Sequence, residues 1–275
     1  MLESSSEEYP EAVAQALTVE QAIANMQSED LSLRYYAAWW LGKFRVSEPA
    51  AVDALIAALE DEADRTELGG YPLRRNAARA LGKLGDRRAV PGLIRCLDSS
   101  DFYVREAAAQ SLEMLHAPAA IPALMPLLAG GVAVAMLVPG RPHLAQPYDA
   151  VLEALGSLGA TVAVPLIQPF LDHPVARVQY AALRAMYQLT TDDVYGRRLV
   201  EALDGSDLKL RRMALADLGA IGYLPAANAI ARCSVENSFK LIALKGLLEH
   251  QLDPLDVQAL SDDVIQVMNL MDALL

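Results

Sequence analysis

Four side chains that bind anions or transfer protons lie within nine positions of the sequence. The segment PGRPHLAQPYD, residues 139–149, contains Arg141, His143, Tyr148 and Asp149. A guanidinium binds carboxylates through paired hydrogen bonds, and an imidazole exchanges a proton near neutral pH. Three prolines in the segment would stiffen the backbone that carries these groups. The segment is therefore the first candidate for a binding or catalytic site.

A second candidate is a basic segment in an acidic chain. From Arg74 to Arg105 there are eight basic and three acidic residues, although the whole chain has a net charge of −12. The surplus arginines, among them Arg75, could hold carboxylates or an acidic partner. A solvated surface position is the alternative for any one of them. Some are expected to pair with the helix-capping aspartates of adjacent repeats, in a recurring position filled by Arg34, Arg74, Arg105 and Arg211.

Aromatic residues gather in the stretch LRYYAAWWLGKFR, which contains both tryptophans and two of the ten tyrosines. Tyr35 and Trp39 are four residues apart, as are Tyr36 and Trp40, so each pair would share one face of a helix. Exposed aromatic residues anchor protein interfaces, which suggests a partner surface. The alternative is that the N-terminal segment folds over these residues as a cap.

Motifs of a self-contained enzyme are missing. The sequence has no GxSxG, no GxxxxGK[ST] phosphate loop and no HExxH, and its four histidines are scattered. Cys96 and Cys233 occupy a repeat position that is otherwise apolar, so we expect packing residues rather than nucleophiles. The sequence predicts no metal site and no resident cofactor.

The composition indicates a helical protein. Of 275 residues, 53% are hydrophobic, with alanine and leucine prominent, and both are strong helix formers. A pI near 4.8 disfavours nucleic acid and anionic membranes as partners. The apolar run 129–139 is too short to span a bilayer, and the acidic N-terminus is unlike a signal peptide. We expect a soluble, cytoplasmic protein.

One unit recurs along the chain and must position all these residues. LRYYAAWWLG at 33–42 reappears as LRRNAARALG at 73–82 and VREAAAQSLE from Val104, with later copies near residues 147, 178, 210 and 239. Most copies are followed by a second apolar segment with an early proline, such as AVPGLIRCL. Apolar residues at helical spacing make each unit a helical hairpin. We predict an all-α solenoid, a right-handed superhelix of HEAT-like hairpins.

The repeat pattern also predicts boundaries. Residues 1–27 form a cap segment, and 28–275 form the solenoid, with insertions near 61–72 and 129–147. Long ordered loops are often functional, although a tolerated insertion is the alternative. Aspartates are expected to cap helices at Asp30, Asp101 and Asp207, and a Thr18/Gln21 capping box is possible. Glycines are expected to end or loosen helices at Gly42, Gly82, Gly85, Gly156, Gly159, Gly219 and Gly222.

The other copies indicate which way the aromatic residues face. The positions of Tyr35 and Trp39 are mostly charged or polar elsewhere, so these two should point outward. The positions of Tyr36 and Trp40 hold small or mixed residues, so these two should lie nearer the seam between units.

The repeat DFYVREAAAQSLEMLHAPAAIPALMPLL resembles the PBS-lyase type of HEAT repeat. RYYAAWWLG and GRPHLAQPYDAVLEALG narrow the resemblance to the E subunits of heterodimeric E/F-type phycobilin lyases, in particular the phycocyanobilin lyases of phycocyanin. The likeness runs from about residue 28 to 250. It implies an enzyme that is active only with an F-type partner subunit and attaches phycocyanobilin through a thioether to a cysteine of the phycocyanin alpha subunit.

The resemblance assigns expected roles, since such a lyase must hold, orient and protonate the bilin. The expected catalytic residues are His143 and Asp149. The expected bilin-binding residues are Arg74, Arg75, Tyr103, Arg105, Glu106, Arg141 and Tyr148. The expected partner interface is Tyr35, Tyr36, Trp39 and Trp40.

Two alternatives remain open. One is a non-enzymatic HEAT-repeat scaffold or adaptor in phycobilisome assembly or degradation. The other is the equivalent lyase-isomerase subunit for phycoerythrocyanin. Covalent chromophore formed on coexpression with the partner, bilin and apo-acceptor would favour the lyase over the scaffold.

Overall fold

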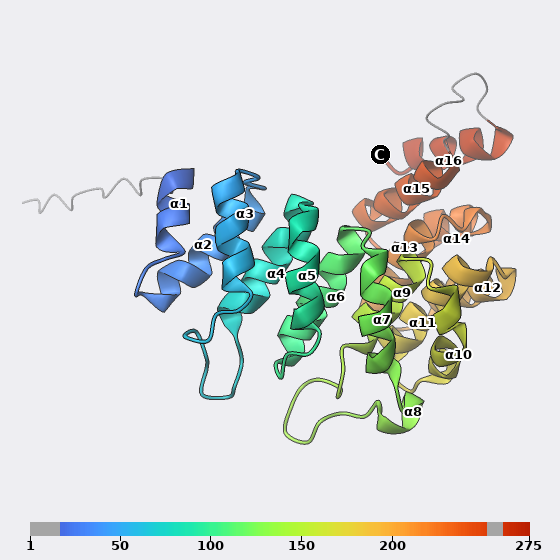
Figure 1. Ribbon diagram of the computed structural model, residues 1–275. Coiled ribbons are helices and arrows are strands. Elements are labelled where there is room, and N and C mark those ends of the chain that lie inside the picture. Colours follow the sequence, from blue (N-terminus) through green and yellow to red (C-terminus); the bar gives the residue numbers. More distant parts are fainter. Residues whose placement is uncertain (1–16, 252–260) are drawn as a thin grey trace, which may run out of the picture.

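The computed structural model describes residues 17–251 and 261–275, which form two layers of helices (Figure 1). The first helices of the hairpins make the inner layer: α2 (Leu31–Lys43), α4 (Pro72–Leu84), α6 (Phe102–Met114), α9 (Tyr148–Ser157), α11 (Ala176–Thr190), α13 (Leu208–Ala220) and α15 (Asn237–Gln251). The second helices make the outer layer: α3 (Pro49–Ala58), α5 (Val90–Cys96), α7 (Ile121–Leu124), α10 (Val164–Ile167), α12 (Asp193–Glu201), α14 (Ala227–Arg232) and α16 (Asp262–Asp272). The predicted all-α solenoid is confirmed.

Small residues let the inner helices lie very close together. A Cβ atom on Gly42 would lie 2.8 Å from the Cα of Ala80, and one on Gly156 would lie 2.6 Å from the Cα of Ala185. No side chain fits at such distances, so these glycines set the spacing between neighbouring inner helices.

The expected role of the glycines is therefore partly wrong. Four lie inside helices at points of close approach, namely Gly42, Gly82, Gly156 and Gly219. Three have positive φ angles of 63° to 77° and follow helix ends, as expected: Gly85, Gly159 and Gly222. Residues without a Cβ atom serve both purposes, so the sequence alone did not distinguish them.

Two of the outer helices, α7 and α10, are short because prolines interrupt them. α7 gives way to a 3₁₀ helix (Met125–Leu128) that contains Pro126, and α10 gives way to one (Gln168–Asp172) that contains Pro169. Proline lacks the N–H that an α-helix interior requires. The outer helices also pack on one another less extensively than the inner helices do. The inner layer is therefore the concave side of the stack.

The predicted caps are present. The carboxylates of Asp30, Asp101 and Asp207 accept hydrogen bonds from the first backbone N–H groups of α2, α6 and α13. Thr18 and Gln21 form a capping box at the start of α1 (Val19–Asn25). Part of the expected cap segment, residues 1–16, lies outside the described residues.

The recurring arginines do not pair with these cap aspartates, which corrects the expectation. Arg74 Nε donates to the carbonyl of Asp61, and Arg211 Nη1 donates to the carbonyl of Gly205. Arg34 pairs with Asp61, which is not a cap. The position serves to hold turns between hairpins, because a guanidinium can satisfy several carbonyl groups at once.

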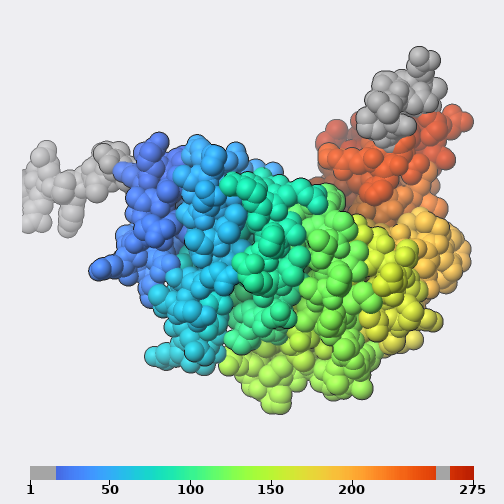
Figure 2. All heavy atoms as spheres, viewed as in Figure 1, coloured from blue at the N-terminus to red at the C-terminus, as the bar shows by residue number. Residues whose placement is uncertain are grey.

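Both insertions leave the same edge of the stack (Figures 1 and 2). The first is the loop 59–71 between α3 and α4. The second, 129–147, contains the single-turn helix α8 (Gly131–Val134) and an isolated antiparallel bridge between Leu137 and Leu144.

Candidate functional site between the two insertions

A pocket of about 480 Å³ opens between the two insertions and the N-terminal ends of α4 and α6. Arg141 Nη2 donates to the carbonyl of Leu68 at 3.2 Å and so joins one insertion to the other. The volume is typical of small-molecule sites. Five residues that the sequence singled out line this pocket: Arg75, Tyr103, Arg105, Arg141 and His143.

His143 is held between two aromatic rings. Its imidazole stacks on Phe102 with ring centroids 4.3 Å apart and meets Tyr103 edge-on at 5.7 Å. Its Nδ1 lies 2.8 Å from the carbonyl oxygen of Leu144. Because a carbonyl only accepts, Nδ1 carries a proton, and Nε2 is left to exchange a proton with a ligand.

Among the described residues, neither Arg75 nor Arg141 takes part in an ion pair. The guanidinium of Arg75 lies 5.9 Å from the centre of the Tyr103 ring, and its buried Nε has no hydrogen-bond partner. The nearby Asp101 carboxylate is occupied by the backbone N–H groups of Tyr71 and Tyr103. The pocket therefore favours an anionic ligand.

Arg105 supports the pocket rather than offering free donors to it. The residue is buried, and its guanidinium donates to Gln146 Oε1 at 2.8 Å and to the carbonyls of Ser99 and Ala145 at 2.6 and 3.0 Å. Burial lowers the pKa of Arg105. It fastens the second insertion to the start of α6.

Tyr148 and Asp149 begin α9 and lie outside the pocket. Tyr148 is 1% exposed and packs on Phe170, so its side chain faces the core and not the pocket. Asp149 faces the inner side of the stack, where Arg177 Nε lies 3.3 Å from its carboxylate. The start of α9 thus separates Tyr148 and Asp149 from Arg141 and His143, which lie in the pocket.

Two further predicted residues also lie elsewhere. The carboxylate of Glu106 lies 3.5 Å from Arg79 on the inner face, and burial raises its pKa. Arg74 pairs with Glu62 and covers the Tyr71 ring, 4.3 Å from its centre.

Phe102 and the residues of the first insertion, such as Thr66 and Leu68, line the pocket but were not predicted. One sequence signal could have found them. The two long intervals interrupt the repeat at the same point, between a second helix and the next first helix, so both loops must leave the same edge.

The inner face carries a cluster of charges that sequence reasoning missed. Arg184 of α11 lies 2.5 Å from Glu113, 3.6 Å from Glu153 and 3.8 Å from Asp217. Burial raises the pKa of Glu153 to about 8 and that of Asp217 to about 7. The carboxylates come from three different helices, so no spacing in the sequence reveals them.

Three of the four predicted interface residues are exposed, namely Tyr35, Tyr36 and Trp39, and Trp40 is half-buried. Tyr36 was expected nearer the seam, but it is 47% exposed. The described part of the N-terminal segment leaves these residues open to solvent.

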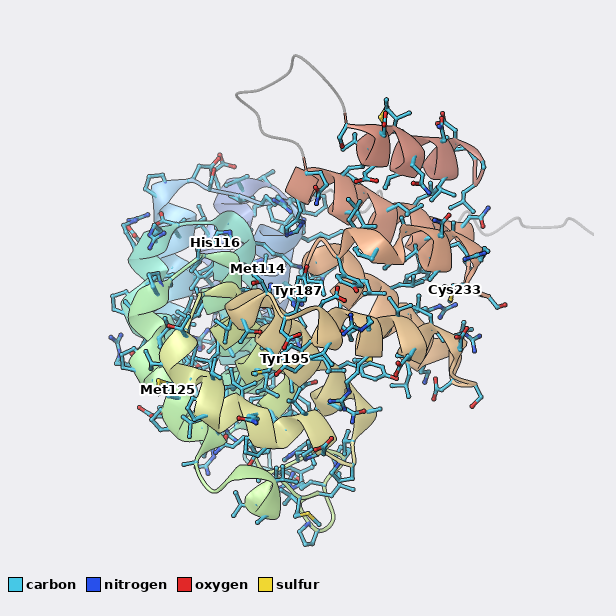
Figure 3. All side chains as sticks on the ribbon, turned by 90° about the vertical axis from the view of Figure 1, so that its right-hand side faces the viewer. Met114, His116, Met125, Tyr187, Tyr195 and Cys233 are labelled. Carbon is cyan, nitrogen blue, oxygen red and sulfur yellow. The ribbon has the colours of Figure 1, made fainter. Side chains whose placement is uncertain are left out.

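Both cysteines are buried, as their repeat position predicted. Burial raises the pKa of Cys96 to about 11, which makes its thiolate scarce. Cys233 lies on the opposite side of the molecule from Met125 when the stack is viewed from its C-terminal end (Figure 3).

Among the described residues, no three side chains of His, Cys, Asp or Glu converge as metal ligands would. Nor does any described helix have the length and apolarity needed to cross a bilayer.

Comparisons with known proteins agree closely with this architecture. Family models match the chain for HEAT repeats over residues 71–133 and for the PBS lyase HEAT-like repeat over 33–61 and 148–173. The chain is 72% identical to phycocyanobilin lyase subunit alpha of Nostoc sp. strain PCC 7120, over the whole of both chains. It is 61% identical to the subunit of the same name from Picosynechococcus sp., with 96% of this chain and 98% of that one covered.

A solved structure is also similar. It is described as the complex of CpcE and CpcF of phycocyanin lyase from Nostoc sp. PCC7120. One of its chains matches with a TM-score of 0.91 and 72% sequence identity, covering 99% of this chain and 100% of that one.

Proposed function

Because this chain belongs to the family of phycocyanobilin lyase alpha subunits, we propose that it is one subunit of a heterodimeric bilin lyase. It works with a CpcF-type partner, as its likeness to a chain of the CpcE–CpcF complex supports. The substrates are phycocyanobilin and the phycocyanin alpha subunit, whose cysteine receives the bilin through a thioether.

The reaction needs no nucleophile from this chain. The acceptor thiol adds across the ethylidene double bond of the bilin. Its sulfur forms the S–C bond at one carbon and loses its proton, and the neighbouring carbon gains a proton, so the addition is balanced. The lyase contributes by holding the bilin in one orientation and by assisting the proton transfer. This division fits a chain whose two cysteines are buried.

The pocket between the insertions is the proposed bilin site. The observation that carries this assignment is that Arg75 and Arg141, beside the imidazole of His143, form no ion pair with any carboxylate in the described part of the chain. Arg75 and Arg141 bind the propionates, His143 Nε2 exchanges the proton, and Tyr103 lies against the tetrapyrrole. Asp149 and Glu106, on the inner face, are not included in this site.

Reconstitution with the CpcF-type partner, phycocyanobilin and the apo-alpha subunit tests the proposal, with covalent chromophore as the readout. The double variant Arg75→Ala/Arg141→Ala should lower the rate of attachment at least about tenfold, since each charge-assisted hydrogen bond contributes roughly 1.5–3 kcal/mol. His143→Ala should lower it by roughly a hundredfold, as for loss of a general acid–base group. Both variants should still form the heterodimer, because none of the three substituted residues belongs to the hydrophobic core.

Arg95→Ala is the matched control. Arg95 is exposed on the outer layer, where it pairs with Glu60 and donates to the carbonyl of Pro91, so attachment should match that of the wild type. Asp149→Asn separates the pocket from the inner face. If Asp149→Asn abolishes attachment while the pocket variants remain active, the site lies on the inner face instead. A wild-type heterodimer that attaches no chromophore would favour a scaffold role.

A further inference from the structure

Phe102 is buried, although the stack of hairpins does not bury it. It is the first residue of α6, it is 4% exposed, and it does not belong to the contiguous hydrophobic core. Leu31 and Leu208 hold the same position of the repeat, at the start of α2 and α13, and each is 38% exposed. Just before α4 the position holds Tyr71, whose ring the guanidinium of Arg74 covers. In these four helices the position is therefore buried only where another group lies over it.

The group that covers Phe102 is the imidazole of His143. The two rings are nearly parallel, with an angle of 15° between them and centroids 4.3 Å apart. Tyr103 meets both rings edge-on, at 5.3 Å from Phe102 and 5.7 Å from His143. Tyr103 is 37% exposed, so it is the aromatic side chain of this group that offers surface to a ligand. Phe102 lines the same pocket but has almost no free surface left to offer.

The backbone around His143 fixes where its side chain begins but not where the imidazole points. The carbonyl of His143 accepts a hydrogen bond from the N–H of Val138 at 3.0 Å, next to the bridge between Leu137 and Leu144. Rotation about the Cα–Cβ and Cβ–Cγ bonds still gives the ring several orientations. The carbonyl of Leu144, 2.8 Å from Nδ1, belongs to the same insertion. The stack on Phe102 is the contact that ties the imidazole to the solenoid.

We propose that Phe102 is a positioning residue for the reaction, which holds the imidazole of His143 so that Nε2 faces the ligand. The inference rests on the proposed function, which assigns the proton exchange to His143. Stacked rings have a defined separation and offset, so the stack permits a narrow range of imidazole orientations. Proton transfer requires this precision, because a misplacement of about 1 Å can lower a rate about a hundredfold. Loss of the Phe102 ring should therefore lower the rate of attachment without lowering the affinity for the bilin.

Two other roles for Phe102 predict different results. If its ring bound the bilin, its loss would weaken bilin binding whether or not His143 is present. If it served only the stability of α6, its loss would lower the free energy of unfolding, and any aromatic or aliphatic replacement of similar size would serve equally well. Neither role makes the effect of Phe102 depend on the imidazole of His143.

Phe102→Leu removes the ring and keeps an apolar side chain. In reconstitution with the CpcF-type partner, phycocyanobilin and the apo-alpha subunit, we expect attachment at saturating bilin to slow about tenfold. The dissociation constant of phycocyanobilin should stay within about twofold of the wild-type value, because Arg75 and Arg141 are unchanged. If Phe102→Leu loses helix content, Phe102→Met takes its place and should give the same result.

Phe102→Tyr is the conservative variant and keeps a ring for the stack. It should restore the rate of attachment to within about threefold of the wild type. A tyrosine already occupies the equivalent position at Tyr71. Leu208→Ala is the matched control, since it shortens the side chain at the same position of another hairpin, outside the pocket. It should attach the bilin as the wild type does. Equal rates in Phe102→Leu and Phe102→Tyr would contradict the inference.

The double variant Phe102→Leu/His143→Ala decides whether the two side chains act together. It should attach the bilin no more slowly than His143→Ala alone, since no imidazole is left to position. A further loss of about tenfold would show that Phe102 acts independently of His143 and would overturn the inference. Weakened bilin binding in Phe102→Leu would overturn it as well.

The single variants separate this inference from the proposed function. Wild-type attachment by Phe102→Leu, with His143→Ala impaired, would overturn the inference and leave the proposed site intact. Wild-type attachment by His143→Ala would overturn the proposed role of His143, and the inference with it.

Nuclear magnetic resonance measures the stack without the reaction. With histidine labelled in this chain alone, the Hε1 resonance of His143 is identified in the heterodimer by its loss in His143→Ala. The ring current of Phe102 should displace this resonance upfield in the wild type and in Phe102→Tyr but not in Phe102→Leu. A wild-type resonance that Phe102→Leu leaves unchanged would show that the two rings do not stack, and the inference would then be wrong.

Discussion

At the scale of single residues, the inner face concentrates negative charge around one arginine. Glu113, Glu153 and Asp217 all lie within 3.8 Å of Arg184, so one positive charge faces three carboxyl groups. Burial raises the pKa of Glu153 and of Asp217, so these two carboxyl groups hold protons more tightly than they would in water. The cluster therefore takes up protons on folding.

Replacing Glu153 with glutamine should change how stability depends on pH. Burial raises the pKa of Glu153 from 4.5 to about 8, so between these values the folded protein keeps a proton that the unfolded chain releases. Wild-type stability must therefore fall as pH rises through this range. Relative to the wild type, Glu153→Gln should gain on the order of 1–3 kcal/mol between pH 5 and pH 8.

Urea denaturation of both proteins at the two pH values measures this difference. The exposed Glu249→Gln is the matched control, since its partner Lys245 lies on the surface. An equal difference between Glu153→Gln and wild type at pH 5 and pH 8 would contradict the prediction.

The candidate site shows what the sequence could predict at this scale. Arg141 and His143 lie in the insertion that the sequence singled out as a candidate site, and the pocket brings them together with Arg75 and Tyr103, which were also expected to bind the bilin. Tyr148 follows only five residues after His143, yet it starts a helix and turns into the core. The difference depends on where the insertion ends, and element boundaries are the weakest part of sequence-based prediction.

At the scale of elements, the spacing of the inner helices depends on residues without side chains. Gly156→Val should lower the free energy of unfolding by roughly 1–3 kcal/mol, because its Cβ atom would already lie 2.6 Å from the backbone of Ala185. Urea denaturation measures the loss.

Gly205→Val is the matched control. The nearest atom to its Cβ would be the carbonyl oxygen of Ala202 at 3.2 Å, and its φ angle of −62° suits any residue. We expect a change within about 0.5 kcal/mol, as for most surface substitutions. Similar losses in both variants would mean that the inner spacing tolerates side chains.

The sequence predicted the hairpins from their periodicity but not the unequal form of the two layers. Pro126 and Pro169 were visible as second prolines in their segments, and each coincides with a change from α-helix to 3₁₀ helix. Periodicity over a few residues cannot separate these two forms, because both place apolar residues three or four positions apart.

At the scale of the whole molecule, each hairpin packs mainly on its neighbours, so stability should be distributed locally. Leu244→Ala, at a fully buried position in α15, removes roughly 2–5 kcal/mol of packing. We expect amide hydrogen exchange to accelerate in α13 to α16 while α4 to α9 keep their protection.

Leu41→Ala in α2, also fully buried, is the counterpart at the other end. It should accelerate exchange in α1 to α3 and leave α13 to α15 protected. Uniform acceleration along the chain in either variant would show that the stack unfolds as a single unit.

Because its two helices pack differently on the neighbouring hairpins, each hairpin is tilted slightly relative to the one before it. Glycine and alanine let the inner helices approach closely, and the outer helices pack on one another less, so each hairpin is narrower on its inner side. The angle between each pair of neighbouring hairpins adds to the next, so the distance between the two ends of the solenoid depends on all of these small angles. A single methyl group added to an inner-layer glycine such as Gly156 would thus change the position of α2 relative to the C-terminal hairpins without contacting α2.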